Sequence, residues 1–356
     1  MREISAIRTS PPEQNARPEN SIAKAPSLIG LRPRWRRVMA AIDESDLSEQ
    51  AISHGIAVAN ALGAELILAH VVEPRQRRES LTDPVEWHLR CQRARSRVEG
   101  FALQRAGEVK HIETRIEEGR PGEQICRLAQ EMHADLTIMC MRGDGRTSDT
   151  GMGQTAQAVV DRAPGSVLLI PGSERGHRHA HYRRVIVPLD GSSRAESALP
   201  LALRLTKAEG AELLLVHAVP KPELTEIGPP EPEDNELRAR VQHRNERVAQ
   251  AYLSCVSARM SCKTPSIRTL LLRNGDSRHL LARAIEDESA DLIVMASHGH
   301  GAHNDVAFGS VASHLLTHAT APILLVRNRS RPLRVHATSH RPAYLTKSSF
   351  AVPRAV

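Results

Sequence analysis

The sequence predicts a doubly wound α/β fold, present twice in one chain of 356 residues. Two observations lead to this prediction: the two halves of the chain repeat each other, and short apolar runs alternate with segments of helical period in each half. With 40% hydrophobic residues, the chain can bury the cores of two domains. Each copy is therefore expected to form a five-stranded parallel sheet with helices on both faces.

The repeat consists of two blocks that align without gaps. Residues 36–70 match residues 183–217 at an offset of 147, and residues 119–170 match residues 275–326 at an offset of 156. The nine extra residues fall in the Pro- and Glu-rich stretch 220–236, where a surface loop tolerates insertion.

The repeat also sets the predicted domain boundaries. The first domain covers residues 36–171 and the second covers residues 183–327, joined by a linker at 172–182. The flanking segments 1–35 and 328–356 are rich in Pro, Ser and Arg and poor in apolar residues, so we expect disordered tails.

Each copy opens with a strand, a helix and a second strand. The helix ends at Gly63 in the first copy and at Gly210 in the second, and glycine is typical of a helix C-terminus. Pro200 lies within the first helix of the second copy and is expected to kink it. The strands are predicted at 38–42 and 66–68 in the first copy and at 185–189 and 213–216 in the second.

A polar helix, two further strands, an amphipathic helix and a fifth strand complete each copy. The fourth strand is apolar throughout, as expected of a central parallel strand covered on both faces. The last helix carries apolar residues at i, i+3, i+4 and i+7. The polar helix and the three strands are predicted at 85–106, 112–116, 136–140 and 167–170, and again at 236–256, 267–272, 292–296 and 323–326.

The net charge of +7 is located in the tails. Residues 1–37 hold eight Lys or Arg against three Glu, and residues 327–356 hold seven against no acid, so the region between them is at about −5. Aromatic residues make up only 2% of the chain, which leaves few platforms for stacking bases. We therefore expect no specific nucleic-acid partner.

The amino-terminal residues and the cysteines indicate a cytoplasmic protein. Residues 1–10 are charged and are not followed by an apolar segment, and no apolar run approaches the length of a membrane span, so no membrane insertion is expected. The five cysteines are odd in number and form no CxxC pair, which argues against a disulfide framework or a thiolate zinc site. His177, His179 and His181 are interpreted as solvated linker residues rather than metal ligands.

The candidate site residues follow the first and fourth strands. Ligands of an open parallel sheet bind beyond the carboxyl ends of its strands. Gly309 and Ser310 are predicted to open the last helix, where backbone N–H groups and a hydroxyl can hold phosphate oxygens, although each glycine taken singly is more often structural. The polar residues at the two strand ends of the second copy are Asp190, Gly191, Ser192, Ser297, His298 and Gly299.

These residues resemble the universal stress protein family, whose signature after the fourth strand is Gly-x2-Gly-x9-Gly-Ser/Thr. The second copy departs from it only at the first glycine, which is Ala296 here. The resemblance implies strand order 3-2-1-4-5 and an ATP site, with Mg²⁺ as the expected metal. The implied contacts are Asp190 near adenine and ribose, the backbone of Ala218 at the base, and Gly299, Gly309, Ser310 and Val311 at the phosphates, with Gly191, Ser192 and His298 beside them.

The first copy departs further from this signature. Cys140, Arg142 and Gln154 replace the first glycine, the histidine and the Ser/Thr, so tight ATP binding is expected in the second domain rather than the first. The equivalent positions that remain are Asp43, Val71, Gly143 and Gly153.

The resemblance implies a stress-response regulator that binds ATP without efficient catalysis. No GxSxG, HExxH or Walker A motif is present to supply a nucleophile, base or phosphate-binding lysine. A slow ATPase, an adenylating enzyme of the same fold and a nucleotide-free interaction module remain as alternatives. The family also pairs through its fifth strand, so we expect the two fifth strands to meet within this chain, while homodimerisation of whole chains stays open.

Overall fold

The computed structural model describes residues 35–74, 83–143, 151–172, 180–223, 232–261, 266–297, 309–318 and 320–327. The tails predicted to be disordered lie outside these residues, as do His177 and His179 of the linker, except that Trp35 is described and packs against the core. The predictions made for those segments therefore stay predictions.

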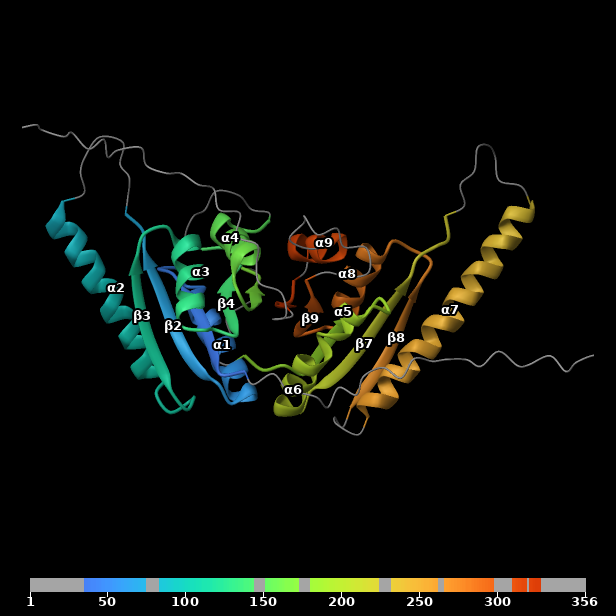
Figure 1. Ribbon diagram of the computed structural model, residues 1–356, viewed down its shortest axis with the longest axis horizontal. Coiled ribbons are helices and arrows are strands. Elements are labelled where there is room, and N and C mark those ends of the chain that lie inside the picture. The colour runs from blue at the N-terminus through green and yellow to red at the C-terminus, as the bar shows by residue number, and fades with distance from the viewer. Residues whose placement is uncertain are drawn as a thin grey trace, which may run out of the picture. The chain divides into compact units, whose positions relative to one another are not determined.

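The described residues form two successive sets of strands and helices (Figure 1). The first domain contains β1 (Arg37–Ile42), α1 (Ser48–Leu62), β2 (Glu65–Val72), α2 (Pro84–Gln104), β3 (Ile112–Glu118), α3 (Pro121–Glu131), β4 (Leu136–Cys140), α4 (Gln154–Arg162) and β5 (Ser166–Ile170). The second contains β6 (Arg184–Pro188), α5 (Ser193–Glu196), α6 (Leu199–Glu209), β7 (Glu212–Val219), α7 (Pro232–Met260), β8 (Ile267–Arg273), α8 (Ser277–Asp287), β9 (Leu292–Ala296), α9 (Ser310–His318) and β10 (Ile323–Val326).

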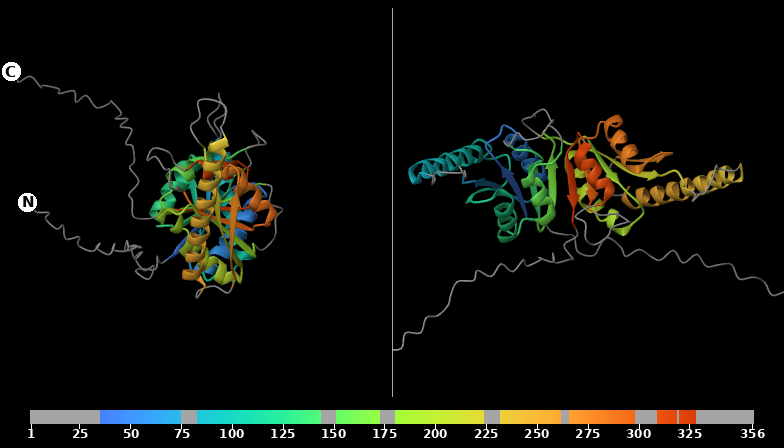
Figure 2. Two further views of the ribbon diagram at one scale, coloured as in Figure 1. Left: turned by 90° about the vertical axis from the view of Figure 1, so that its right-hand side faces the viewer. Right: turned by 90° about the horizontal axis from the view of Figure 1, so that it is seen from above.

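The ten strands of the described residues join into one sheet in the order β3-β2-β1-β4-β5-β10-β9-β6-β7-β8. Counted from either outer edge, each half runs 3-2-1-4-5, with parallel pairing inside each domain. Helices lie on both sides of the strands, as Figures 1 and 2 show. The predicted fold class and strand order are confirmed.

Two helices were missing from the sequence prediction. Helices α3 and α8 each connect the third strand of a domain to the fourth, and each buries an apolar face that recurs at three- and four-residue spacing. In α3 this face consists of Ile125, Leu128 and Ala129, and Pro121 stands in the first turn, where its missing N–H costs no helical hydrogen bond. The signals were therefore present in the sequence, but short helices between strands are easily overlooked.

Pro200 does more than kink the first helix of the second domain. The chain forms two separate helices there: α5 ends at Glu196, and α6 begins at Leu199 with Pro200 in its first turn. Proline has no backbone N–H and cannot continue a helix through its interior without loss of a hydrogen bond. The helix ends at Gly63 and Gly210 are as predicted: both glycines adopt left-handed backbone, with φ of 63° and 66°.

A repeated aspartate anchors the first strand of each domain. One carboxylate oxygen of Asp291 accepts hydrogen bonds from the backbone N–H groups of Arg183 and Arg184, each at 2.8 Å. Asp135, which is 3% exposed, binds the N–H groups of Arg36 and Arg37 in the same way. A buried carboxylate that satisfies two backbone donors is strongly favoured, which gives the repeated Ala-Asp-Leu sequence a structural role.

The two fifth strands meet at the domain interface, as predicted. Strands β5 and β10 pair antiparallel, with Leu168 opposite Leu324 and Leu169 opposite Ile323. The core on each face of the sheet is continuous across both domains: one face carries α1, α2, α6 and α7, and the other carries α3, α4, α8 and α9. Because the cores are shared, the two domains form one packed unit.

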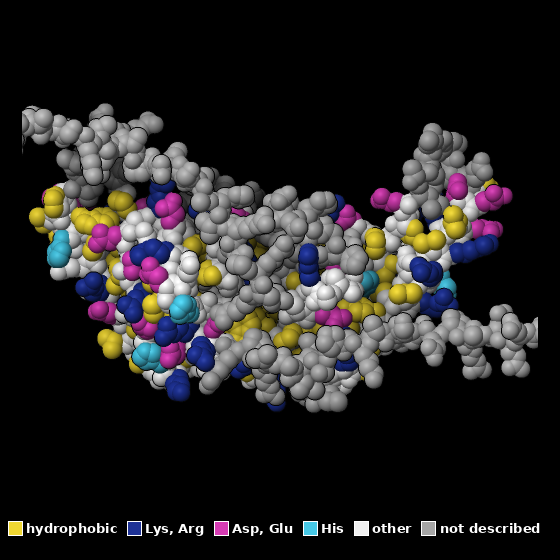
Figure 3. Space-filling model, in the orientation of Figure 1, with side chains coloured by type: hydrophobic (Ala, Val, Ile, Leu, Met, Phe, Trp, Pro, Cys, Tyr) yellow, Lys and Arg dark blue, Asp and Glu magenta, His cyan; other side chains and the backbone are white. Residues whose placement is uncertain are grey.

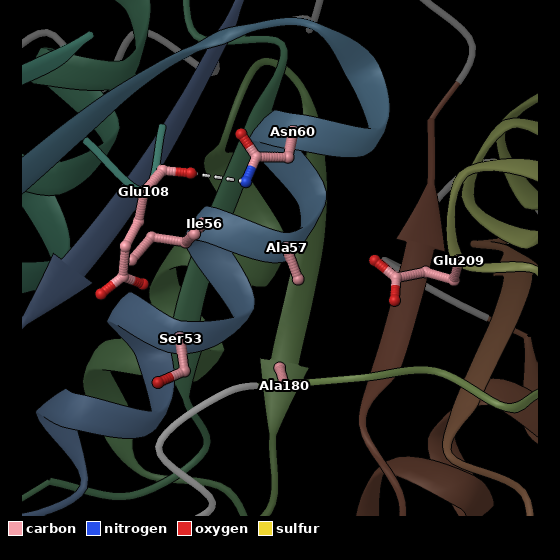
Figure 4. Close-up of a pocket in the computed structure, with 7 residues that line it drawn as sticks. All are labelled: Ser53, Ile56, Ala57, Asn60, Glu108, Ala180 and Glu209. Atoms are coloured by element: carbon pink, nitrogen blue, oxygen red, sulfur yellow. Dashed lines mark hydrogen bonds between the residues drawn. The ribbon is translucent and has the colours of Figure 1, made fainter. Parts of the chain in front are cut away.

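Polar contacts add to this interface. Arg204 of α6 donates to the carbonyl oxygen of Leu62 at the end of α1 at 2.6 Å. The Nδ1 atom of His54 lies 2.7 Å from the hydroxyl of Tyr182, and both side chains are buried. A pocket of about 320 Å³ remains beside them, lined from α1 by Ser53, Ile56, Ala57 and Asn60 and otherwise by Glu108, Ala180 and Glu209 (Figure 4).

The surface of the described residues has no single charge character in the view of Figure 3. Basic and acidic side chains are interspersed there rather than gathered into one field. Among the described helices, none is both long and apolar enough to cross a membrane.

Candidate functional site

Asp190 stands in a fixed turn at the carboxyl end of the first strand of the second domain. Its Oδ1 atom accepts a hydrogen bond from the N–H of Ser192 at 2.9 Å, which forms an Asx turn. The hydroxyl oxygen of Ser192 in turn accepts from the N–H of Ala195 at 3.1 Å and caps α5. The Asp190 side chain itself is exposed. Gly191, with φ of 82°, allows the tight left-handed step between them.

The start of α9 lies next to the end of β9. The N–H of Gly309 donates to the carbonyl oxygen of Ser297 at 3.2 Å, and the N–H of Ser313 donates to the carbonyl oxygen of Gly309 at 3.0 Å. Ser310 is the first residue of the helix and is exposed. The prediction that Gly309 and Ser310 open this helix is confirmed, and the N–H groups of the first turn have no carbonyl partner within the helix.

Five other positions of the second domain belong to the predicted site, and three of them lie in described strands and helices. Ala218 lies in β7 and Ala296 at the end of β9, and both are half-buried. Val311 is the second residue of α9. His298 and Gly299 lie outside the described residues.

His217 ties the strand that carries Ala218 to the strand that carries Asp190. Its Nδ1 atom lies 2.8 Å from the carbonyl oxygen of Leu189, the residue before Asp190. Because a carbonyl oxygen can only accept, Nδ1 carries the proton in this contact. His217 therefore has a structural role, because its ring links the ends of β6 and β7.

Tyr252 of α7 is a neighbour of this site that the sequence analysis missed. Its ring meets the ring of His217 edge-on, with centroids 6.1 Å apart. Burial raises the pKa of the Tyr252 hydroxyl, and the carboxylates of Glu196 and Asp190 raise it further, so the hydroxyl stays protonated. The only signal in the sequence was an aromatic residue on a polar helix, in a chain with few aromatic residues.

In the first domain, Asp43 is held by two serines that follow it in the chain. Its Oδ1 atom accepts from the N–H of Ser45 at 3.0 Å and from the hydroxyl of Ser48 at 2.9 Å. A Cβ atom added to Gly143 would lie 2.2 Å from Oδ2 of Asp43. The structure thus brings two predicted residues into direct contact, and only glycine fits beneath this carboxylate.

The loop of the first domain closes in the same way as that of the second. The N–H of Gly153 donates to the carbonyl oxygen of Met141 at 2.8 Å, matching the contact between Gly309 and Ser297. Arg142, which replaces the signature histidine, donates from Nε to the carbonyl oxygen of Gly151 at 3.0 Å. This arginine is therefore hydrogen-bonded within the loop. Val71 of β2 is half-buried, as is its counterpart Ala218 of β7.

Three histidines lie on the surface of α8 and α9. The rings of His314 and His318 stack with centroids 4.2 Å apart, and His279 approaches His314 at 4.9 Å. No group of three or more His, Cys, Asp or Glu side chains among the described residues is arranged to hold a metal ion. The pKa of His314 is lowered by burial first. The nearby His318, His279 and Arg278 lower it further, and Asp276 opposes them.

This cluster predicts a loss of stability in mild acid. Since His314 binds a proton less readily in the folded state than in the unfolded state, stability is lost as the pH falls below about 6.5. Denaturant unfolding measured between about pH 7.5 and 5 should show this slope, and His314→Gln should flatten it. His243→Gln, a change of an exposed histidine on α7, should leave the slope unchanged, and equal effects of the two variants would contradict the assignment.

Known proteins resemble this chain along both domains. The sequence profile of the universal stress protein family matches residues 34–171 and 181–327. A universal stress protein of Mycolicibacterium smegmatis is 24% identical over 305 residues, covering 82% of this chain and 97% of the relative. One of Thermus aquaticus is 33% identical over 147 residues, covering 41% of this chain and 99% of the relative.

Solved structures show the same fold across both domains. A putative universal stress protein of Pseudomonas aeruginosa aligns with a TM-score of 0.58 at 14% identity, covering 82% of this chain and 92% of the other. One of Archaeoglobus fulgidus aligns with a TM-score of 0.54 at 17% identity, covering 83% and 99%. The family profile matches two segments, each segment has the strand order 3-2-1-4-5, and a relative aligns over 82% of the chain. The chain therefore belongs to the universal stress protein family.

Proposed function

We propose that this protein binds ATP in its second domain and acts in the cytoplasm as a stress-response regulator without efficient catalysis. The observation that supports this most is the start of α9. Gly309 is bonded back to Ser297 at the end of β9, so the unpaired N–H groups of the helix begin beside the carboxyl edge of the sheet. A helix start in this place favours a phosphate group by hydrogen bonding and by the helix dipole.

The residues around this helix start fit the rest of ATP. Asp190 is exposed at the end of the first strand, where its carboxylate can accept hydrogen bonds from ribose hydroxyls. Ala218 has a small side chain, which lets a flat base approach the backbone of β7. Ser310 offers a hydroxyl to a phosphate oxygen.

Mg²⁺ fits this site without a protein cage. The described residues contain no cluster of three side chains arranged as metal ligands. Mg²⁺ often keeps several waters and binds through substrate phosphates, so the nucleotide itself would carry most of the metal's ligands. In this proposal the protein holds the phosphates, and the metal accompanies them.

A catalytic role has less support. The turn after β6 reads Asp190-Gly191-Ser192-Ser193, and the hydroxyl oxygen of Ser192 already serves as a helix cap. A slow ATPase would reveal itself by phosphate release over many turnovers of purified protein. We expect no more than one phosphate per chain on the timescale of ATP exchange.

Thermal unfolding tests the proposed binding directly. At a concentration near 100 times Kd, ATP should stabilise the folded protein by about 2.7 kcal/mol. For a domain of this size, that gain corresponds to about 5–10 °C in melting temperature. Adenosine, which lacks the phosphates that α9 would hold, should give a much smaller shift. An unchanged melt at millimolar ATP would rule the proposal out.

A further inference from the structure

A second pocket lies in the first domain at the carboxyl ends of β1 and β2, on the side of the sheet that carries α2. It has a volume of about 520 Å³ and is lined by Ile42 and His70, at the ends of β1 and β2, and by one side of α2. Successive residues of a strand point to opposite faces. Val71, the predicted base-contact position, packs into the core on the α3 and α4 side, whereas Ile42 packs into the core on the α1 and α2 side.

Helices α2 and α7 correspond to each other at an offset of 155 residues. Ala94 and Val98 are the buried residues of α2, and Ala249 and Leu253 are buried at the matching positions of α7. Strand register gives the same offset, because His70 pairs with Ile116 in β3 and His217 pairs with Leu271 in β8. At this offset, Arg97 occupies the position of Tyr252.

In the second domain, the ring of Tyr252 therefore occupies the place that is a pocket in the first domain. Tyr252 sets its ring edge-on against His217. In the first domain, the guanidinium group of Arg97 lies over the ring of Phe101, with 5.6 Å between its Cζ atom and the ring centroid. The place beside His70 is thus not filled by an aromatic side chain of α2.

His70 gives the pocket a defined polar group. Its side chain is 6% exposed, and its Nδ1 atom lies 2.9 Å from the carbonyl oxygen of Ile42, as Nδ1 of His217 does from Leu189. Nδ1 therefore donates, which leaves Nε2 as the acceptor of the ring in this tautomer. A ligand with an O–H or N–H group is suited to this acceptor.

Both basic and acidic side chains line the pocket. Arg90, Arg93 and Arg97 project from successive turns of α2, the N-terminal end of α2 adds Asp83 and Glu86, and Asp43 and Glu44 lie in the turn after β1. The carboxylate of Asp43 is fixed by hydrogen bonds from Ser45 and Ser48. The apolar side chains of Ile42, Ala94 and Val98 also line the pocket.

We propose that this pocket binds a small hydroxylated aromatic acid. The ring lies beside His70, as the ring of Tyr252 lies beside His217. The carboxylate binds the guanidinium groups of Arg93 and Arg97, which suit it in charge and in geometry. The hydroxyl points to the wall formed by His70, Asp43 and Glu44. This site does not depend on ATP binding in the second domain.

Calorimetric titration of the full chain with 4-hydroxybenzoate tests the proposal. We expect saturable binding of one molecule per chain. The double variant Arg93→Gln, Arg97→Gln should bind about 10- to 100-fold more weakly, the effect of losing charge-assisted hydrogen bonds. The matched control Arg244→Gln, Arg247→Gln changes two exposed arginines of α7 and should leave the affinity unchanged.

A second variant fills the pocket with a side chain of the protein itself. Arg97→Tyr introduces the residue that the second domain has at this position, and it should abolish 4-hydroxybenzoate binding while the melting temperature is retained. Binding that survives both the double variant and Arg97→Tyr would overturn the proposal. So would equal affinity for inorganic phosphate, or displacement of the bound acid by ATP.

Discussion

Replacing Leu324 by alanine is expected to lower the free energy of unfolding by about 2–5 kcal/mol, the usual cost of truncating a fully buried leucine. Leu324 has no exposed surface and lies directly opposite Leu168 across the antiparallel pair of β5 and β10. The cavity would open in a core that both domains share. Chemical denaturation measures the loss, and hydrogen exchange should show faster exchange in both β5 and β10.

Leu103→Ala is the matched control for this prediction. Leu103 lies near the end of α2 with 77% of its side chain exposed, so its truncation should change stability by no more than about 0.5 kcal/mol. If Leu324→Ala accelerated exchange only in the second domain, the two domains would not share a cooperative core. The pairing of the fifth strands would then be a contact without energetic coupling.

Gly309→Val should weaken ATP binding by about 10- to 100-fold. The backbone of Gly309 lies against Ser297, and a branched side chain at the start of α9 would stand where a phosphate must approach the N–H groups. The loss of charge-assisted hydrogen bonds, about 1.5–3 kcal/mol, gives this factor. Equilibrium dialysis or calorimetry with ATP measures it.

Gly153→Val makes the same change in the first domain. A Cβ atom at Gly153 would lie 3.2 Å from the carbonyl oxygen of Met141, so we expect reduced stability of the first domain. The affinity for ATP should stay within about two-fold of the unaltered protein. Equal losses of affinity in the two variants would show that the domains do not differ in the way proposed.

Much of the fold could be predicted from the repeat and from local pattern. The apolar fourth strands, the helix-ending glycines at 63 and 210 and the amphipathic last helices all lie where the sequence places them. Helices α3 and α8 were missed although each carries a buried apolar face. Pro200 was interpreted as a kink, whereas it starts a new helix, a position where proline is tolerated best.

The residues of the candidate site likewise include some that the sequence revealed and one that it did not. Asp190 and the pair Gly309 and Ser310 could be found because each follows or opens an element that the sequence itself marks. Tyr252 could not, because it lies on a polar helix and reaches the site only through the packing of α7 on the end of β7.

The sequence by itself determined that one fold is present twice, where its ten strands lie and which glycines open and close helices, because these depend on residue periodicity and backbone freedom. The tertiary structure decided which residues far apart in the chain share a site. The clearest example is the pair Arg97 and Tyr252: the two occupy equivalent places, yet one leaves a pocket beside a histidine and the other fills it. That difference depends on the direction of a side chain in space, which no spacing along the chain encodes.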